Sequence, residues 1–224
     1  MEQIGFLGAY DKKDLLLNVA TVLTNAGKSV LIVDATSIQR MRYVVPNIST
    51  NQSFSYVSEY SKIDVALGFM SLNDIAQFLR KNLDYDYIFI DSDNPQTMNS
   101  FGIQTMKKIF FVTSYEQYDM LKGAEVLRFV QMPIEVVKVI STTNMTDAED
   151  KLLNSKVANS NIKWSNSRIE FSDMDIDRRA ILKNQFSKQI SFKSFSKDYK
   201  QWLEYLVNII TDNTIEANKI IKRI

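Results

Sequence analysis

The loop after the first predicted strand carries residues whose types and spacing suggest phosphate chemistry. Residues 8–14 read GAYDKKD and lie between a buried strand at 4–7 and an amphipathic helix. A phosphate loop of the pattern G-x-x-x-x-G-K-[ST] holds phosphates with backbone N–H groups and a lysine, and its hydroxyl binds Mg²⁺. Gly8 begins this loop, and Lys12 stands where the pattern has its lysine. The loop is therefore a candidate phosphate site.

Two residues of this loop oppose the binding of a nucleotide and its metal. Asp11 replaces the glycine before the lysine, and its carboxylate would repel a phosphate about 4 Å away by several kcal/mol. Lys13 replaces the hydroxyl, and an ammonium cannot ligate Mg²⁺ because it offers no lone pair. We expect a loop that no longer binds ATP productively. Binding without efficient hydrolysis, an active enzyme, and self-neutralisation among Asp11, Lys12, Lys13 and Asp14 are open alternatives.

Two carboxylates end predicted buried strands that follow this loop. Asp34 ends the apolar run 30–33, and Asp91 ends the run 87–90. The carboxyl ends of parallel strands meet at one edge of a sheet, so both side chains should reach the crevice beside the loop. Without a hydroxyl from the loop, they are poor candidates for Mg²⁺ ligation. We expect them to pair with Lys12 or Lys13, and we predict neither a catalytic residue nor a metal site.

The order of these segments resembles that of the MinD/ParA ATPases, SIMIBI-class P-loop proteins with a deviant Walker A motif. The family's KGGVGKTT, the helix asparagine that follows and GK-VLLIDAD are similar to residues 7–36, with Asn18 and Gly27-Lys28 as fixed points. The family's YDYIIIDT resembles residues 85–92, and its next core strand resembles 109–114. The resemblance covers most of the chain. It implies a P-loop NTPase-like α/β fold, a single three-layer α/β/α domain with a mostly parallel sheet.

The resemblance also implies site roles, several of which this sequence lacks. The family's phosphate lysine falls on Lys12, and the aspartate that acts through water on Mg²⁺ falls on Asp91. The lysine that reaches the nucleotide of a dimer partner falls on Leu7, and the aspartate assigned to hydrolysis falls on Thr36. The six residues of the weak or vestigial nucleotide site are thus Gly8, Asp11, Lys12, Lys13, Asp34 and Asp91.

Base recognition is also altered. The asparagine that reads adenine in the family would fall near Ser141 or Thr142, and Asn144 comes slightly late. The scaffold that we expect needs no cofactor, whereas the alternative, a weak ATPase, would use ATP with Mg²⁺.

Composition narrows the classes of function. The 224 residues are 45% hydrophobic and contain no cysteine and no histidine. This excludes disulfides, thiolate chemistry, the usual zinc sites and every triad that needs imidazole. We expect one domain over 1–224, closed by a C-terminal helix at about 196–224. No run of about 18 apolar residues occurs, and the first ten residues lack a basic flank, so a cytoplasmic location is expected.

The C-terminal part is basic. Residues 178–224 hold ten Lys/Arg against four Asp/Glu, or +6, and the rest holds seventeen against twenty-two, or −5. A solvated helix face explains this asymmetry, and DNA binding is not expected because nothing else supports it. Residues 218–224 are basic and apolar on one side, as in the membrane-targeting tail of MinD-like proteins. Seven residues bind a membrane only weakly, so we expect a plain helix end, with peripheral contact at the inner face of the membrane as the alternative.

Apolar periodicity predicts the remaining elements. An N-cap is expected within 71–74, and 37–61 should be irregular apart from a short strand at 41–45. Helices are predicted at 14–25, 75–83, 115–131, 147–160 and 176–185, and strands at 63–69, 85–91, 108–113 and 134–141, with a short edge strand within 162–171.

The sequence supports two functions. The first is a non-catalytic, nucleotide-insensitive scaffold or positioning protein for a bacterial secretion, pilus or conjugation machine, similar to degenerate relatives of the CpaE/TadZ kind. It would act through a protein partner of a membrane-associated machine. The second is a weak ATPase that dimerises for spatial positioning or plasmid partitioning. A homodimer is an open alternative under either function.

Overall fold

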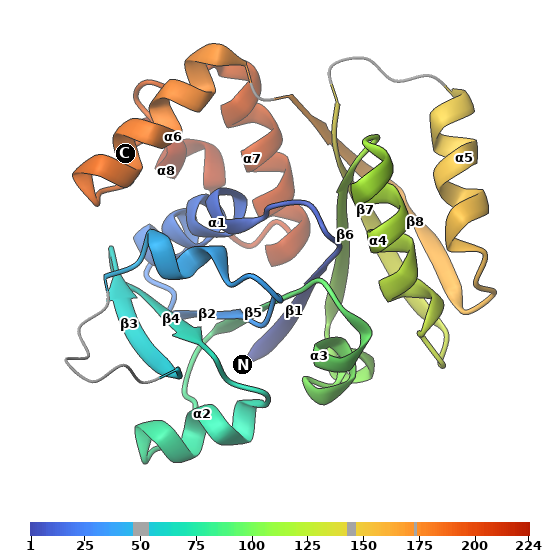
Figure 1. The fold of residues 1–224 in the computed structure, drawn as a ribbon. Coiled ribbons are helices and arrows are strands. Elements are labelled where there is room, and N and C mark those ends of the chain that lie inside the picture. Colours follow the sequence, from blue (N-terminus) through green and yellow to red (C-terminus); the bar gives the residue numbers. More distant parts are fainter. Residues whose placement is uncertain (47–53, 143–146, 173) are drawn as a thin grey trace.

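The structure, a computed structural model, describes residues 1–46, 54–142, 147–172 and 174–224. Its centre is one eight-stranded sheet with the order β3-β4-β2-β5-β1-β6-β7-β8 (Figure 1). All neighbouring strands pair in parallel except β3, which is antiparallel to β4. The strands are β1 (Glu2–Leu7), β2 (Val30–Asp34), β3 (Tyr56–Tyr60), β4 (Ile63–Leu67), β5 (Tyr87–Ser92), β6 (Lys108–Ser114), β7 (Ile134–Ser141) and β8 (Ile162–Phe171).

Two layers of helices cover the sheet. α1, α6, α7 and α8 pack on one face and α2 to α5 on the other, and each layer forms its own apolar cluster with the strands. This confirms the predicted three-layer α/β/α domain. The helices are α1 (Lys13–Asn25), α2 (Leu72–Leu79), α3 (Pro95–Ser100), α4 (Gln117–Arg128), α5 (Asp147–Val157), α6 (Asp175–Ser187), α7 (Lys197–Thr211) and α8 (Ala217–Arg223), with short 3₁₀ helices η1 (Arg40–Tyr43) and η2 (Ile103–Thr105).

The central strands β2, β5, β1 and β6 are buried almost throughout. Strands covered on both faces are apolar without alternation, which is why runs such as VLIVD were recognisable. Their register aligns Asp34 with Asp91 and Leu7 with Ser92. The loop after β1 and both carboxylates therefore lie at one edge of the sheet.

The segment 37–61 differs from the prediction, and its residues 47–53 lie outside the described part. The strand expected at 41–45 is wrong, because Arg40–Tyr43 form the 3₁₀ helix η1. A strand that was not expected, β3, pairs with β4 through a tight turn in which Ser61 and Lys62 have φ of 52° and 68°. Positive φ at both turn residues matches the twist of an antiparallel hairpin.

The C-terminus also differs. The single closing helix expected at 196–224 is two helices, α7 and α8, separated where Asp212 and Asn213 adopt φ of 53° and 60°. Ala217 and Ile221 of α8 are buried in the core with α1 and α7. The apolar side of the tail therefore packs inside the protein. The edge strand is longer than expected, since β8 has ten residues.

Candidate functional site

Gly8 turns the chain sharply at the end of β1. Its φ is +124°, and a Cβ there would meet the carbonyl oxygen of Val112 at 2.2 Å. Its N–H donates to the Ser92 oxygen at 3.1 Å. Only glycine allows this conformation next to another strand. The fold is therefore a sufficient reason for Gly8, without a role in phosphate binding.

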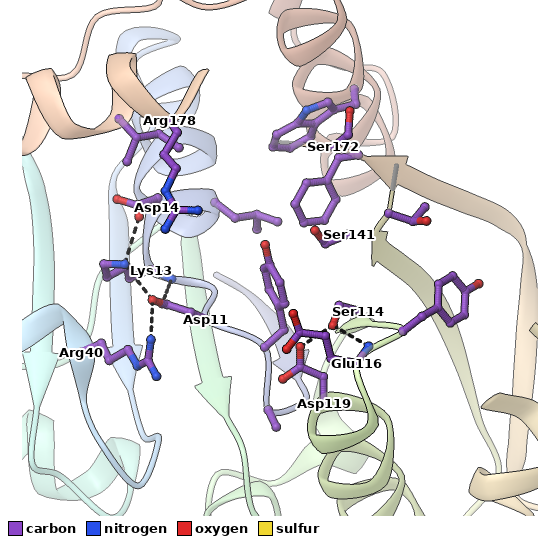
Figure 2. Close-up of a pocket in the computed structure, with 18 of the residues that line it drawn as sticks. Asp11, Lys13, Asp14, Arg40, Ser114, Glu116, Asp119, Ser141, Ser172 and Arg178 are labelled. Atoms are coloured by element: carbon purple, nitrogen blue, oxygen red, sulfur yellow. Dashed lines mark hydrogen bonds and ion pairs between the residues drawn. The ribbon is translucent and has the colours of Figure 1, made fainter. Parts of the chain in front are cut away.

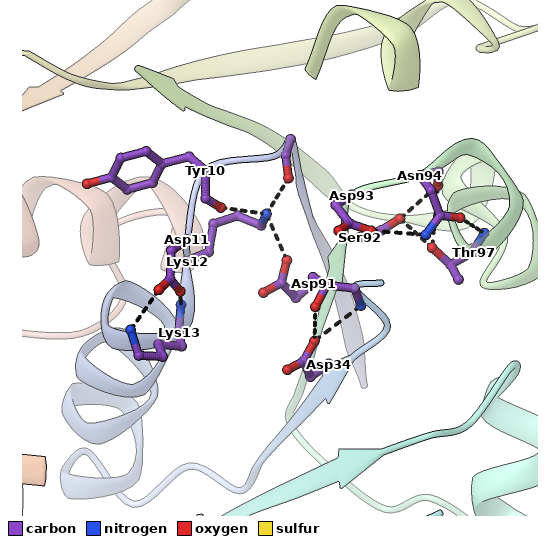
Figure 3. A network of polar contacts seen from close by, with 12 residues as sticks. Tyr10, Asp11, Lys12, Lys13, Asp34, Asp91, Ser92, Asp93, Asn94 and Thr97 are labelled. Carbon is purple, nitrogen blue, oxygen red and sulfur yellow. Dashed lines mark hydrogen bonds and ion pairs between the residues drawn. The ribbon is translucent and has the colours of Figure 1, made fainter. Parts of the chain in front are cut away.

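Lys12 is directed into its own loop and is buried, with 2% of its surface exposed. Its Nζ donates to the Gly8 oxygen at 2.5 Å and the Tyr10 oxygen at 3.1 Å, and lies 3.0 Å from Asp91 Oδ1 (Figure 3). An ammonium has three protons, and three protein oxygens surround this one. The predicted pairing of Asp91 with Lys12 is confirmed.

The two carboxylates at the strand ends are held differently. Burial raises the pKa of Asp91 to about 7; Lys12 opposes this rise, and the neighbouring Asp34 adds to it. Asp34 pairs with neither lysine, so that part of the prediction is wrong. Its carboxylate accepts from Thr36 N and Oγ1 at 3.1 and 2.6 Å and from Met41 N at 3.1 Å. Burial raises the pKa of Asp34 despite these donors.

Asp11 lies at the start of α1, surrounded by donors. It accepts from the backbone N–H of Lys13 at 3.2 Å, from Lys13 Nζ at 2.7 Å and from Arg40 Nη1 at 3.1 Å. Burial opposes its ionisation, but Lys13 and Arg40 outweigh burial and the pKa of Asp11 lies below its usual value. Lys13 also pairs with Asp14 at 3.0 Å. Four charged side chains thus neutralise one another here, three of them from the cluster proposed from the sequence.

Two cavities adjoin the loop. The smaller, of about 60 Å³, lies among Lys12, Asp34 and Asp91 and has room for only a few water molecules. The larger, of about 1060 Å³, is a cleft between α1 with α6 and the loops that follow β6, β7 and β8 (Figure 2). One wall presents Arg178, and the facing wall presents Glu116 and Asp119.

The structure brings the six predicted residues together at one edge of the sheet. Arg40 was missed, because it lies in a segment without periodicity and its partner Asp11 is 29 positions away in the sequence. Ser141 and Thr142, near which the resemblance places the family's adenine-reading asparagine, line the large cleft, and Asn144 lies outside the described residues. Asn18 donates to the Tyr199 hydroxyl at 2.6 Å, a contact that joins α1 to α7.

No protein-family model and no curated protein matches the sequence. A ParA family ATPase from Chlorobium tepidum TLS is similar over 93% of this chain and 98% of its own, at 14% identity and a TM-score of 0.59. The MinC:MinD cell division protein complex of Aquifex aeolicus is similar over 96% of this chain and 98% of its own, at 13% identity and a TM-score of 0.58. The septum site-determining protein MinD of Pyrococcus horikoshii OT3, complexed with Mg-ADP, is similar over 95% of this chain and 98% of its own, at 11% identity and a TM-score of 0.55.

This is a P-loop NTPase-like fold of the MinD/ParA type. The similarity extends over nearly the whole chain at low identity, so it shows the architecture and leaves catalytic status to the chemistry of the loop. Leu7, on which the resemblance places the family's first lysine, is fully buried in the core. Within the described part of the chain, no helix is long and apolar enough to cross a membrane.

Proposed function

We propose that this chain is a non-catalytic, nucleotide-insensitive MinD/ParA-like scaffold or positioning protein. One observation carries the proposal: the carboxylate of Asp11 accepts the backbone N–H of Lys13 at the start of α1. Backbone N–H groups at a helix start are what a phosphate loop offers to phosphate. Here an anion of the protein itself accepts that hydrogen bond.

The charges around Asp11 support this interpretation. Lys13 and Arg40, which could attract a phosphate, both pair with Asp11. Lys12 is enclosed by the loop carbonyls and Asp91, so it would have to break three contacts to meet a phosphate. A triphosphate would therefore enter next to a fixed carboxylate and gain no unpaired cation in the loop.

The residues around Asp91 do not suit a Mg²⁺ ion either. A magnesium site in such a loop needs an oxygen ligand where this chain has Lys13. The remaining carboxylates are already used, since Asp91 faces Lys12 and Asp34 accepts from Thr36 and Met41. These side chains therefore do not fit the metal that ATP hydrolysis uses.

The proposed role is protein recognition at a bacterial cell-envelope machine of the secretion, pilus or conjugation type, as in relatives of the CpaE/TadZ kind. Support comes from the fold, which this chain shares with the MinD of the MinC:MinD complex and with a ParA family ATPase. Such a protein would work in the cytoplasm or at the inner face of the membrane. Any homodimer would form without nucleotide, because the cross-dimer lysine is replaced by the buried Leu7.

The alternative, a weak ATPase, is favoured by one observation, the retention of Lys12 and Asp91 side by side at 3.0 Å. Isothermal titration calorimetry with ATP and Mg²⁺ separates the two functions. We expect no binding, and a Kd below about 100 µM, roughly −5.5 kcal/mol, would overturn the scaffold proposal.

A gain-of-function variant makes the test sharper. Asp11→Gly combined with Lys13→Thr removes the internal anion and restores the hydroxyl. We expect this double variant to bind ATP with Mg²⁺ with a Kd below about 100 µM, where the natural chain gives no binding. Asp14→Asn is the matched control, because Asp14 pairs with Lys13 without accepting the N–H at the start of the helix.

A further inference from the structure

A second groove runs along the free side of β8, the last strand of the sheet. Its volume is about 560 Å³, and it lies between β8 and α7. Five consecutive residues, Arg168 to Ser172, form one wall, so the strand itself borders the groove. The other wall is a single face of α7, with Asp198, Gln201, Trp202, Tyr205 and Asn208.

The backbone of β8 has hydrogen-bonding groups that face this groove. The Phe171 oxygen accepts from Thr142 N at 2.8 Å, so the peptide groups of Phe171 point towards the β7 side. Successive residues of a strand point their peptide groups to opposite sides. The N–H and C=O of Glu170 therefore point away from β7, on the side where the described residues form no further strand. An open strand edge of this kind is a template for another strand.

The α7 wall supplies an apolar surface for side chains. The Trp202 ring packs on Phe171 with centroids 5.1 Å apart, and Tyr205 is 44% exposed. Trp202 Nε1 is buried and has no acceptor among the described residues. A strand placed beside β8 would direct every second side chain towards these rings.

The charge of the groove selects the partner. Three carboxylates (Glu170, Asp198 and Glu204) and one guanidinium (Arg168) line it, a balance of −2. Arg168 pairs with Glu170 at 2.9 Å, whereas no ion pair of Asp198 or Glu204 occurs among the described residues. Glu204 accepts only from the Asn218 amide in that part. The rim therefore favours cationic side chains.

We propose that this groove binds an extended, basic segment of a partner protein, which adds to the sheet as a further strand beside β8. Alternate apolar side chains of the segment pack against Trp202 and Tyr205, and its lysines or arginines meet Asp198 and Glu204. The inference deepens the proposed function, because it names a site and a partner chemistry for a scaffold that acts by protein recognition.

Trp202 is a reporter for the test. In a Trp164→Phe background it is the sole tryptophan, since the chain has two. The probe is a capped peptide of about ten residues that alternates lysine with valine, and a glutamate–valine peptide is the charge control. We expect the lysine peptide to change the emission of Trp202 with a Kd of roughly 10–100 µM and the glutamate peptide to have no effect.

Two variants at one position separate backbone pairing from charge. Glu170→Pro removes the N–H that points into the groove and leaves the β7 ladder intact, because proline is tolerated at an edge. We expect Glu170→Pro to weaken the binding of the lysine peptide at least tenfold. Glu170→Gln, which keeps the N–H, should weaken this binding less than about threefold. Asp198→Asn with Glu204→Gln should weaken binding and flatten its salt dependence.

The proposal is overturned if the lysine peptide gives no change at millimolar concentration, or if Glu170→Pro binds it as well as Glu170→Gln does. Should Glu170→Pro fail to fold, lysine peptides N-methylated at the odd or at the even positions replace it. One of the two should then lose binding to the natural chain, and equal binding by both overturns the proposal. Absence of peptide binding together with absence of ATP binding removes this inference alone, whereas ATP binding removes the scaffold function.

Discussion

The ammonium of Lys12 lies among two loop carbonyls and the Asp91 carboxylate and is almost fully buried. The resemblance places the family's phosphate lysine on Lys12, yet the contacts of this side chain stabilise the loop itself. A buried charge that loses its partner is costly, because desolvation is no longer offset by attraction. The role of Lys12 in this chain can therefore be measured as stability.

Replacement of Lys12 by methionine should lower the free energy of unfolding by about 3–5 kcal/mol, because it leaves Asp91 buried without a cation. Urea denaturation followed by tryptophan fluorescence measures the loss. The double variant Lys12→Met with Asp91→Asn should recover part of it. A loss below about 1 kcal/mol in the single variant would contradict a structural role for the ion pair.

Asp91 should make stability depend on pH. Its pKa is about 7 in the folded protein, against about 3.9 in an unfolded chain. Between these values the folded state binds more protons, so the contribution of Asp91 to stability is complete below pH 4 and is lost as the pH rises through 7. The fall in unfolding free energy from pH 5 to pH 8 should be larger for the natural chain than for Asp91→Asn. Equal falls would show that Asp91 does not titrate in this range.

Among the elements, the loop after β1 depends most on a single residue. Gly8 has φ of +124° and no room for a Cβ beside the Val112 carbonyl, whereas Gly27, with φ of +82°, has no atom within 4 Å of that position. Both glycines permit a left-handed backbone. Only at Gly8 does a close approach add to the conformational requirement.

Alanine at these two positions separates the two effects. Gly27→Ala should cost about 1–2 kcal/mol, the ordinary penalty of a left-handed alanine. Gly8→Ala should cost more than about 3 kcal/mol, because the loop must also move away from β6. Thermal unfolding by circular dichroism gives both values. Similar losses at both positions would refute the close packing of the loop against β6.

Prediction from the sequence succeeded for strands that are buried along their whole length. It failed for elements and side-chain pairs that depend on contacts between distant parts of the chain. Strands such as β2 and β5 are apolar because they are covered on both faces, so their sequences identify them. β3 was missed although its buried tyrosines and Ser58 alternate with the less buried Val57 and the exposed Glu59, because the alternation is only five residues long and follows a polar segment. The pairing of Arg40 with Asp11 joins residues 29 positions apart, and no local pattern encodes such a contact.

At the scale of the whole molecule, α8 closes the helical layer that contains α1 and α7. Ile221 is 3% exposed, and Ile220 and Ile224 pack partly against the same cluster. The sequence of the tail is amphipathic in either setting, a membrane or a protein surface, so its pattern alone could not distinguish them. The packing of α8 assigns its apolar side to the core.

Ile221→Ala should therefore destabilise the protein by about 2–5 kcal/mol through a cavity in the core. Lys222→Ala, at an exposed neighbour, is the control and should change stability by less than about 0.5 kcal/mol. Chemical denaturation measures both, and sedimentation with anionic vesicles should show no binding by the full chain. Vesicle binding that Ile221→Ala abolishes without loss of stability would restore the membrane role of the tail.

Asp11 has a consequence for the life of the protein in its cell. Under the proposed scaffold function, a molecule that carries its own anion at the start of α1 would keep the same loop conformation in starved and in growing cells, whatever the ratio of ATP to ADP. A scaffold of this kind would have no cycle of nucleotide binding and hydrolysis to time its action. The time and place at which it acts must then be set by how much of it is made and by when its partner becomes available.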